Sequence, residues 1–272
     1  MSLWKRKKVQ TMPWKIMSNW DNKSIVIIGS GAVAHYFTNL FIENGISIAG
    51  IHSRNERTGN HIAEQYNIPF FNSISATGGA VYLVAVKDDA VIAIINELPK
   101  TAAVIYTSGT IDLSLIKHPN CSVFYPLQSF DGDLSMKAQE IPVLLESTNT
   151  ESNSDLQELC KTLGLPYFDV NSEKRKEIHL CAVFLNNFIN HMGTIAFDEM
   201  KSRNIEFEIL KPLLEKTMRQ LLTGNSLQKQ TGPAKRNDKS TIIEHKKMLS
   251  GENLKVYNVM TNSILKKFGY EL

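Results

Sequence analysis

Short hydrophobic runs alternate with helically spaced hydrophobic positions from residue 21 to about residue 171. Residues 25–28 are four consecutive β-favouring apolar residues, as in a strand buried on both faces, and residues 35–43 have helical spacing. The same alternation then predicts strands at 46–51, 68–71, 79–86, 103–106, 121–124, 141–145 and 166–170, and helices at 58–66, 90–98 and 155–163. The Ser/Thr/Asn-rich run 147–154 is interpreted as a surface loop. This order is typical of a mostly parallel α/β sheet.

From Ser172 onward the strand signals largely stop. Apolar residues keep helical spacing up to about residue 202, and Ser172 ahead of them fits a helix N-cap. Further helices are predicted at 205–223, with Pro212 as a possible break, and at 241–249 and 253–268. The pattern therefore divides the chain into a disordered extension (1–20), an α/β domain (21–171) and an all-α C-terminal domain (172–272).

A glycine-rich turn joins the first predicted strand to the first predicted helix, at residues 29–34. Gly29 permits the tight turn, Gly31 lets the backbone approach a pyrophosphate, and Ala34 lets the helix pack close to the strand. The helix N-terminus then offers free N–H groups to phosphates. The turn predicts a Rossmann-type dinucleotide site, with an ordinary strand–helix turn as the alternative. The candidate cofactor-binding residues here are Gly29, Ser30, Gly31, Ala32 and Val33.

The end of the second strand indicates which dinucleotide is bound. An NAD site usually carries an acidic residue about 20 positions after the glycines, where it holds the ribose hydroxyls. Here Ser53 and Arg54 stand at that position, with Arg57 one helical turn later. A guanidinium binds a 2′-phosphate that a carboxylate would repel. We therefore predict NADP(H) rather than NAD(H), with a solvated loop charge as the alternative role of Arg54.

Two later strands end in residues that suit the nicotinamide ribose. In open parallel sheets, ligands bind beyond the carboxyl ends of the strands. Ordinary turn chemistry is the alternative interpretation of both ends. The candidates are Val86 and Lys87 after one strand, and Thr107, Ser108 and Gly109 after the other.

Composition narrows the class of protein. With 43% hydrophobic and 21% charged residues, the 272-residue chain has a globular composition, and its net charge of +3 is too small to indicate nucleic-acid binding. Three cysteines in apolar surroundings fit reduced thiols in a cytoplasmic protein. We expect no membrane span or secretory signal, and no Cys/His cluster with metal-ligand spacing is present in the sequence.

Several motifs together resemble a known superfamily. They are residues 26–34, Thr107-Ser-Gly109, Tyr125-Pro-Leu-Gln-Ser-Phe130, residues 179–187 and residues 231–238. The chain looks like 6-phosphogluconate dehydrogenase and pyrroline-5-carboxylate reductase, and most of all like bacterial NADP oxidoreductases whose C-terminal half is a domain of unknown function. The resemblance covers about residues 21–272. Tyr125 departs from it, because a histidine is expected before Pro-Leu-Gln.

The long predicted helix carries the candidate catalytic residues, His179 and Asn187. With Val183 and Asn186 they occupy positions i, i+4, i+7 and i+8 of one helix face. In related β-hydroxyacid reductases a lysine donates the proton from the position that Val183 occupies here, so that chemistry is not supported. His179 is a candidate general acid, or alternatively a core or interface histidine. The asparagines are candidates to bind the nicotinamide amide or a substrate carbonyl, or simply pack at an interface.

Two further residues are candidates for contact with the substrate. Gln128 lies in the Tyr125–Phe130 motif, and Arg236 lies in the polar loop 231–238, where it suits a substrate carboxylate or is a solvated charge. Asp238 or Ser240 is expected to cap the helix that follows this loop.

The sequence thus predicts an NADP(H)-dependent oxidoreductase that transfers a hydride to a small carbonyl or imine substrate in the interdomain cleft. The alternative is a non-catalytic NADP(H)-binding sensor or regulatory module. The long helix carries apolar residues on more than one face, which predicts a homodimer formed through the helical domain. The expected partners are therefore a small-molecule substrate and a second copy of the chain, with no nucleic acid and no membrane.

Overall fold

A computed structural model describes Trp20 and residues 23–78 and 81–270. The chain forms two compact units, and the boundary between them along the sequence falls between Asn186 and Asn187. The predicted extension at 1–20 lies outside the described residues except for Trp20. The Trp20 indole is buried, and its N–H donates a hydrogen bond to the carbonyl of Asp155. Trp20 thus packs with the first unit.

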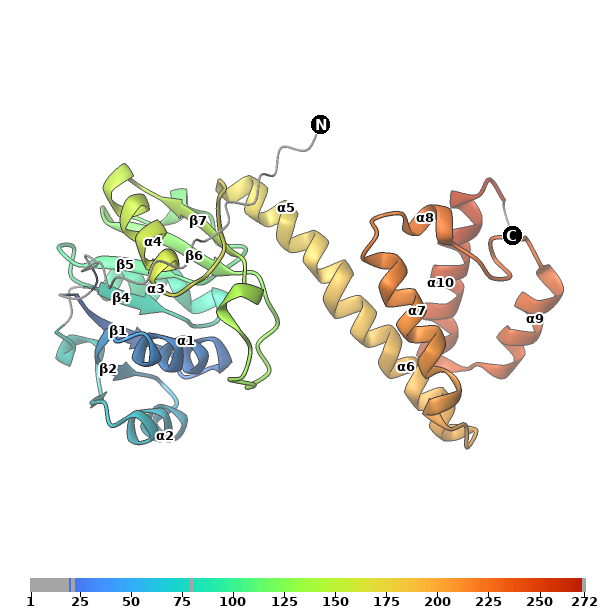
Figure 1. Ribbon diagram of the computed structural model, residues 1–272, viewed down its shortest axis with the longest axis horizontal. Coiled ribbons are helices and arrows are strands. Elements are labelled where there is room, and N and C mark those ends of the chain that lie inside the picture. Colours follow the sequence, from blue (N-terminus) through green and yellow to red (C-terminus); the bar gives the residue numbers. More distant parts are fainter. Residues whose placement is uncertain (1–19, 21–22, 79–80, 271–272) are drawn as a thin grey trace. The chain divides into compact units, whose positions relative to one another are not determined.

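An eight-stranded sheet forms the centre of the first unit (Figure 1), in the order β3-β2-β1-β4-β5-β6-β7-β8. The strands are β1 (Ser24–Ile28), β2 (Ser47–His52), β3 (Phe70–Phe71), β4 (Val81–Val84), β5 (Ala103–Tyr106), β6 (Cys121–Pro126), β7 (Val143–Ser147) and β8 (Tyr167–Asp169). All neighbours pair in parallel except β6 and β7. The predicted mostly parallel sheet is confirmed.

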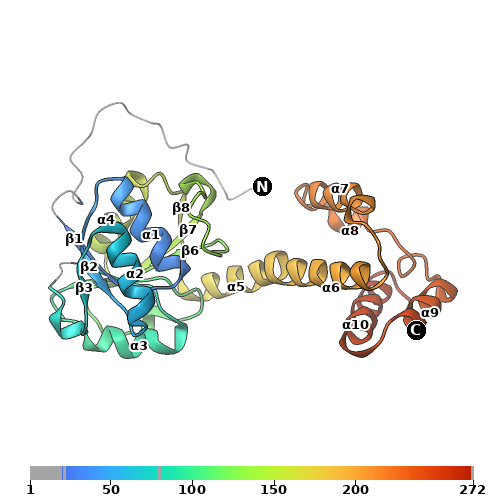
Figure 2. The same ribbon diagram turned by 90° about the horizontal axis from the view of Figure 1, so that it is seen from below.

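Helices cover both faces of this sheet. On β1, Ile25 and Ile27 point into one core and Val26 and Ile28 into the other, because side chains alternate along a strand. The first core is closed by α1 (Ala32–Glu43), α2 (Glu56–Tyr66) and α4 (Thr150–Thr162), and the second by α3 (Asp88–Glu97). Figure 2 shows α1 and α2 in front of the strands. Short 3-10 turns complete the unit at η1 (Ile74–Ala76), η2 (Leu113–Leu115) and η3 (Ala138–Glu140).

The run 147–154 is not the surface loop that its composition predicted. Strand β7 continues to Ser147, and α4 begins at Thr150. The side chain of Asn149 caps this helix by accepting a hydrogen bond from the backbone N–H of Ser152, at 2.8 Å. Polar residues that favour loops also favour helix N-termini, which is why composition alone gave the wrong element here.

A continuous helix from Ser172 to Ser202 follows β8. It consists of α5 (Ser172–Ala182), a π-helical turn, η4 (Val183–Phe188), and α6 (Ile189–Ser202). Its N-cap is Asn171, whose side chain accepts from the N–H of Lys174 at 2.9 Å, so the prediction of Ser172 as the cap was wrong by one residue. By length and composition alone this helix could also cross a membrane, although one such helix is weak evidence.

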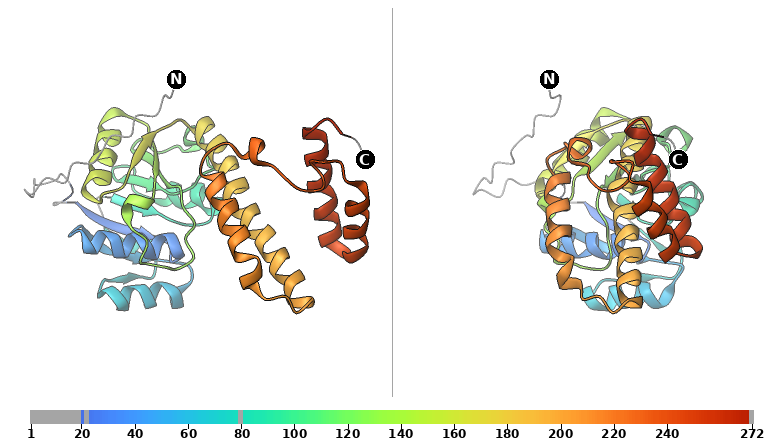
Figure 3. Two further views of the ribbon diagram at one scale, coloured as in Figure 1. Left: turned by 45° about the vertical axis from the view of Figure 1, so that its right-hand side comes forward. Right: turned by 90° about the vertical axis from the view of Figure 1, so that its right-hand side faces the viewer.

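The second unit is helical. Besides α6 it contains η5 (Phe207–Ile209), α7 (Lys211–Leu221), α8 (Ser226–Lys229), α9 (Lys239–Met248) and α10 (Gly251–Lys267). The predicted helix 205–223 is interrupted near Pro212, as anticipated. Helix α7 begins at Lys211, and Pro212 lies in its first turn, where its missing N–H costs nothing. Asp238 caps α9 as predicted, by accepting from the N–H of Thr241. Helices α9 and α10 pack together through Ile242 and Leu265 (Figure 3).

Candidate functional site

The glycine turn after β1 is held close to the neighbouring strands. The Gly29 N–H donates to the carbonyl of His52 at 2.8 Å, and Gly29 has a φ of +123°. A Cβ at Gly29 would lie 2.2 Å from the carbonyl oxygen of Ala85, whereas a Cβ at Gly31 would meet nothing within 4 Å. Gly29 is therefore required by the fold, and the open space beside Gly31 leaves its backbone accessible to a ligand.

Three hydroxyl groups gather beside this turn. The Ser30 hydroxyl lies 2.7 Å from that of Ser53 and 2.6 Å from that of Thr58. Ser53 is buried and also accepts a hydrogen bond from the N–H of Asn55, while the Arg54 side chain is exposed. Hydroxyl donors next to a free guanidinium suit a phosphate group. The described residues at the end of β2 include no carboxylate.

A cavity of about 820 Å³ lies along these strand ends, within the first unit. Ten of the twelve predicted cofactor-binding residues line it: Gly29, Ser30, Gly31, Ala32, Val33, Ser53, Arg54, Val86, Lys87 and Thr107. They come from the ends of β1, β2, β4 and β5, which meet at one edge because the four strands are parallel. Phe130 closes part of the wall. The volume falls within the range of ordinary small-molecule and cofactor sites.

Ser108 and Gly109 do not line this cavity. The Ser108 hydroxyl is buried and accepts from the N–H groups of Thr110 and Ile111, so it stabilises its own turn. Gly109 instead leaves space for two side chains. A Cβ there would lie 2.8 Å from Cζ of Tyr125 and 3.1 Å from Nδ1 of His179.

Tyr125 and His179 form a hydrogen-bonded pair at this point. The Tyr125 hydroxyl lies 2.8 Å from Nδ1 of His179, and the two rings meet edge to face. Tyr125 is in β6 and His179 is in α5, 54 residues later. Burial raises the pKa of Tyr125, the nearby Asp88 carboxylate raises it further, and Arg175 opposes both. The tyrosine at the position where a histidine was expected therefore has a histidine as its partner.

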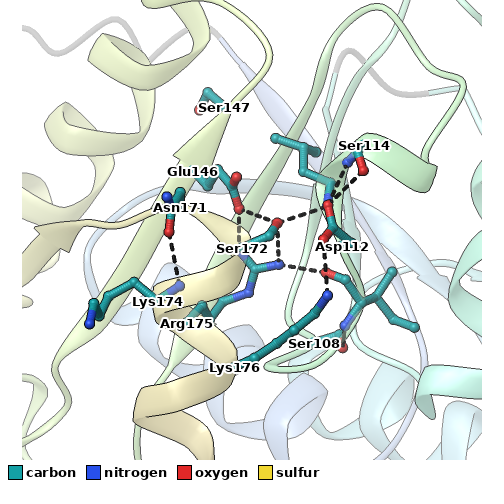
Figure 4. A network of polar contacts seen from close by, with 12 residues as sticks. Ser108, Asp112, Ser114, Glu146, Ser147, Asn171, Ser172, Lys174, Arg175 and Lys176 are labelled. Carbon is teal, nitrogen blue, oxygen red and sulfur yellow. Dashed lines mark hydrogen bonds and ion pairs between the residues drawn. The ribbon is translucent and has the colours of Figure 1, made fainter.

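The start of α5 is fixed to the sheet by a buried ionic network (Figure 4). The Arg175 guanidinium is fully buried and forms an ion pair with Glu146 of β7. It also donates to the Ile111 carbonyl and to the Ser172 hydroxyl. Ser172 in turn donates to Glu146 at 2.7 Å and accepts from the N–H of Leu113. This network sets the position of His179, one helical turn after Arg175.

A second ion pair supports the same end of α5 from the surface (Figure 4). The Lys176 ammonium lies 2.9 Å from a carboxylate oxygen of Asp112. Hydrogen bonds from Lys176 and Ser114 hold the pKa of the Asp112 carboxyl well below its usual range. Because both side chains are partly solvated, this pair contributes less stability than the buried one.

The π-helical turn changes the predicted catalytic face. Positions i, i+4, i+7 and i+8 share a face only in a regular α-helix, and a π-turn shifts the residues that follow it. Val183 opens this turn, and Asn186 and Asn187 lie within it and are exposed. The prediction that His179 and Asn187 share one face of a regular α-helix was therefore wrong. Neither asparagine lines the cavity.

The two remaining substrate candidates are exposed. The Gln128 side chain donates to the carbonyl of Glu140 at 3.0 Å, so in this structure it stabilises its loop. Arg236 lies in the loop before α9, in the second unit. Within the part of the chain that the structure describes, no group of three or more His, Cys, Asp or Glu side chains could hold a metal ion.

Comparisons with known proteins agree with this geometry. Residues 24–109 match the family described as NADP oxidoreductase, coenzyme F420-dependent, and residues 141–264 match a domain of unknown function, DUF2520. The chain thus resembles an NADP oxidoreductase domain over its first part and a DUF2520 domain over its second. The predicted family resemblance and the predicted NADP(H) class of the cofactor are thereby confirmed. No curated protein matches the chain.

Solved structures share the fold over almost the whole chain. A provisionally assigned NADP oxidoreductase from Bacteroides fragilis is 29% identical, with a TM-score of 0.83, over 91% of this chain and all of that one. An imine reductase from Myxococcus stipitatus in complex with NADP+ has 12% identity and a TM-score of 0.67, covering 91% of this chain and 95% of its own. A 1-pyrroline-5-carboxylate reductase from Streptococcus pyogenes has 15% identity and a TM-score of 0.55, covering 90% and 98%.

Proposed function

We propose that this protein is an NADPH-dependent reductase that transfers a hydride to the carbon atom of a small imine or carbonyl substrate. The observation that carries the proposal is the 820 Å³ cavity, where the glycine turn and the Ser53-Arg54 strand end meet. The glycine turn would bind the pyrophosphate, and Ser30, Ser53 and Arg54 would bind the 2′-phosphate. Val86, Lys87 and Thr107, which also line this cavity, would contact the nicotinamide ribose.

The residues present fit the cofactor. At Gly29 the chain tolerates no side chain, and beside Gly31 it leaves open space. NADPH, when bound, supplies the hydride. The protein must then bind and orient the substrate and provide a proton to its heteroatom. His179 is proposed to take part in supplying that proton, because it is hydrogen-bonded to Tyr125 and the Arg175 network fixes its position.

Imines are the favoured substrate class. Two of the proteins that share this fold are named for imine substrates. Our candidates for contact with the substrate remain Asn186, Asn187, Gln128 and Arg236, and Arg236 is suited to a carboxylate.

We also propose a cytoplasmic location, because the free cysteines Cys121, Cys160 and Cys181 fit a reducing compartment.

We also propose a homodimer. In the described part of the second unit only four apolar side chains are buried: Met200, Ala234, Ile242 and Leu265. Large apolar side chains on the long helix are exposed, among them Phe184 (58%) and Leu185 (67%). A second copy of the same helical surface is the simplest cover, since twofold contacts are the commonest oligomer symmetry.

The experiment is NADPH binding followed by turnover. We expect nicotinamide fluorescence to rise when NADPH is added to the full chain, and absorbance at 340 nm to fall when cyclic imines such as 2-methyl-1-pyrroline are then supplied. Gly29→Ala is the control, because its Cβ would clash with Ala85 and the residue would be strained at a φ of +123°. Absence of NADPH binding by the wild-type chain would refute the proposal.

The second candidate function is an NADPH sensor without turnover. It is favoured by Val183, which replaces the proton-donating lysine of related β-hydroxyacid reductases and cannot transfer a proton. The same experiment decides between the two. Binding of NADPH with no oxidation across a panel of imines, ketones and 2-oxoacids would favour the sensor.

A further inference from the structure

We propose that Tyr125 is the acid that delivers the proton to the substrate, and that His179 replenishes it from behind. The proposal rests on the reductase function above and names the group in contact with the substrate. It follows from the position of Tyr125 on the sheet and from its bond to His179.

The position of the Tyr125 phenol is set by strand β6. Tyr125 lies near the end of β6, and β6 pairs with β5, whose next residue, Thr107, lines the cofactor cavity. Gly109, two residues after Thr107, has no side chain, and a Cβ there would lie 2.8 Å from the Tyr125 ring. The ring therefore lies beside Gly109, two residues beyond the cavity-lining Thr107, and is not itself part of the cavity wall. Its backbone pairs with Leu144 of β7, so the phenol stands on a rigid element.

The imidazole of His179 has one ring nitrogen on the Tyr125 hydroxyl. Nδ1 of His179 is engaged by the Tyr125 hydroxyl at 2.8 Å, and His179 is only half-buried. A ring with one nitrogen on a phenol and the other available can accept a proton at Nε2 and release one at Nδ1. The Arg175 network holds α5 against the sheet and so maintains this bond.

The O–H bond of Tyr125 breaks as an N–H bond forms on an imine substrate, or an O–H bond on a carbonyl. The phenolate oxygen takes the proton from Nδ1–H of His179 while Nε2 takes one from solvent, so the ring stays neutral. Exchange with solvent then restores the Nδ1–H form, and each turnover consumes one solvent proton. The burial that raises the pKa of Tyr125 keeps the phenol protonated at neutral pH, ready to donate. His179 acts through Tyr125 and is a positioning and relay residue.

The test compares Tyr125→Phe with Tyr66→Phe in the full chain, with NADPH and 2-methyl-1-pyrroline. Tyr66 is a matched control, because its hydroxyl also donates a hydrogen bond, to Asn39, but lies at the end of α2 and has no bond to His179. We expect Tyr125→Phe to lower kcat about 10²-fold or more while the Kd for NADPH changes less than about twofold. Tyr66→Phe should leave both unchanged. Retention by Tyr125→Phe of more than about a tenth of the wild-type kcat would overturn the assignment.

His179→Gln separates donor from relay. The amide N–H of glutamine can still donate a hydrogen bond to the phenol oxygen but cannot pass on a proton, so we expect a smaller loss of kcat than in Tyr125→Phe and an unchanged KM. The reverse order of losses would make His179 the group in contact with the substrate and overturn the proposal. If the wild-type chain binds NADPH but oxidises it with none of the imines, the reductase function itself has failed and this proposal fails with it.

If Tyr125→Phe does not fold, a fluorinated tyrosine at position 125 tests whether Tyr125 is the proton donor. Fluorine lowers the pKa of the phenol without removing its hydroxyl. The charged and titratable groups around this hydroxyl are His179 and Arg175 on α5 and Asp88 on α3, and all are retained. We expect the alkaline limb of the kcat profile to move to lower pH, together with the ¹⁹F resonance titration measured without substrate. An unmoved limb would overturn the proposal.

Discussion

The buried pair of Arg175 and Glu146 gives the sharpest stability prediction. Removing one partner of a buried ion pair typically costs about 3–5 kcal/mol, because the other charge is left unpaired. The side chain of Arg175 is 0% exposed and that of Glu146 is 19% exposed. After Arg175→Met, Glu146 keeps the Ser172 hydroxyl and some solvent, so we expect a cost near about 3 kcal/mol. After Glu146→Leu, a fully buried guanidinium loses its counter-charge, so we expect about 5 kcal/mol.

The double variant isolates the interaction. Replacing both partners by apolar residues leaves no buried charge, so we expect its stability to lie within about 1 kcal/mol of the wild type. Urea unfolding measures this without changing the ionic strength. Tryptophan fluorescence is a suitable signal, since all three tryptophans lie in the first 20 residues and Trp20 packs in the core of the first unit. Single variants that cost less than about 1 kcal/mol each, or a double variant that costs the sum of both, would refute the reasoning.

Three further predictions concern the cofactor, the assembly and the thiols. Arg54→Ala should weaken NADPH binding by about 1.5–3 kcal/mol in fluorescence titrations and leave NADH binding little changed, whereas equal losses would contradict the 2′-phosphate assignment. Light scattering should report about twice the chain mass of 30.6 kDa, and Leu185→Glu should shift it to the monomer; a wild-type monomer at micromolar concentration would reject the dimer. At pH 8 a thiol reagent should label only Cys181 in the folded protein, because burial raises the pKa of Cys121 to about 12 and that of Cys160 as well; rapid labelling of all three would contradict the packing.

Local sequence patterns were enough to predict most of the sheet domain, and the residues they proposed for the cofactor largely line one cavity. The turn at Gly29 and Gly31 is a property of a few consecutive residues, and the Ser53-Arg54 pair follows its strand directly. Parallel strands bring their carboxyl ends together whatever their exact lengths, so residues placed at those ends by the hydrophobic pattern met in one cavity. The errors arose where one residue type serves two local structures, as at Asn149 and Ser172.

The grouping of Tyr125, His179, Arg175 and Glu146 was decided only by the tertiary structure. Tyr125 and His179 are 54 residues apart, and Arg175 and Glu146 are 29 apart. No periodicity within a helix or strand links such positions. Their contact depends on the strand order, on the antiparallel pairing of β6 with β7 and on the direction in which α5 leaves the sheet. The sequence by itself thus determined the elements and the cofactor class, because these depend on neighbours along the chain. The hydrogen-bonded pair of Tyr125 and His179 and its buried ionic support came from the packing of the elements, because that packing sets which distant side chains meet.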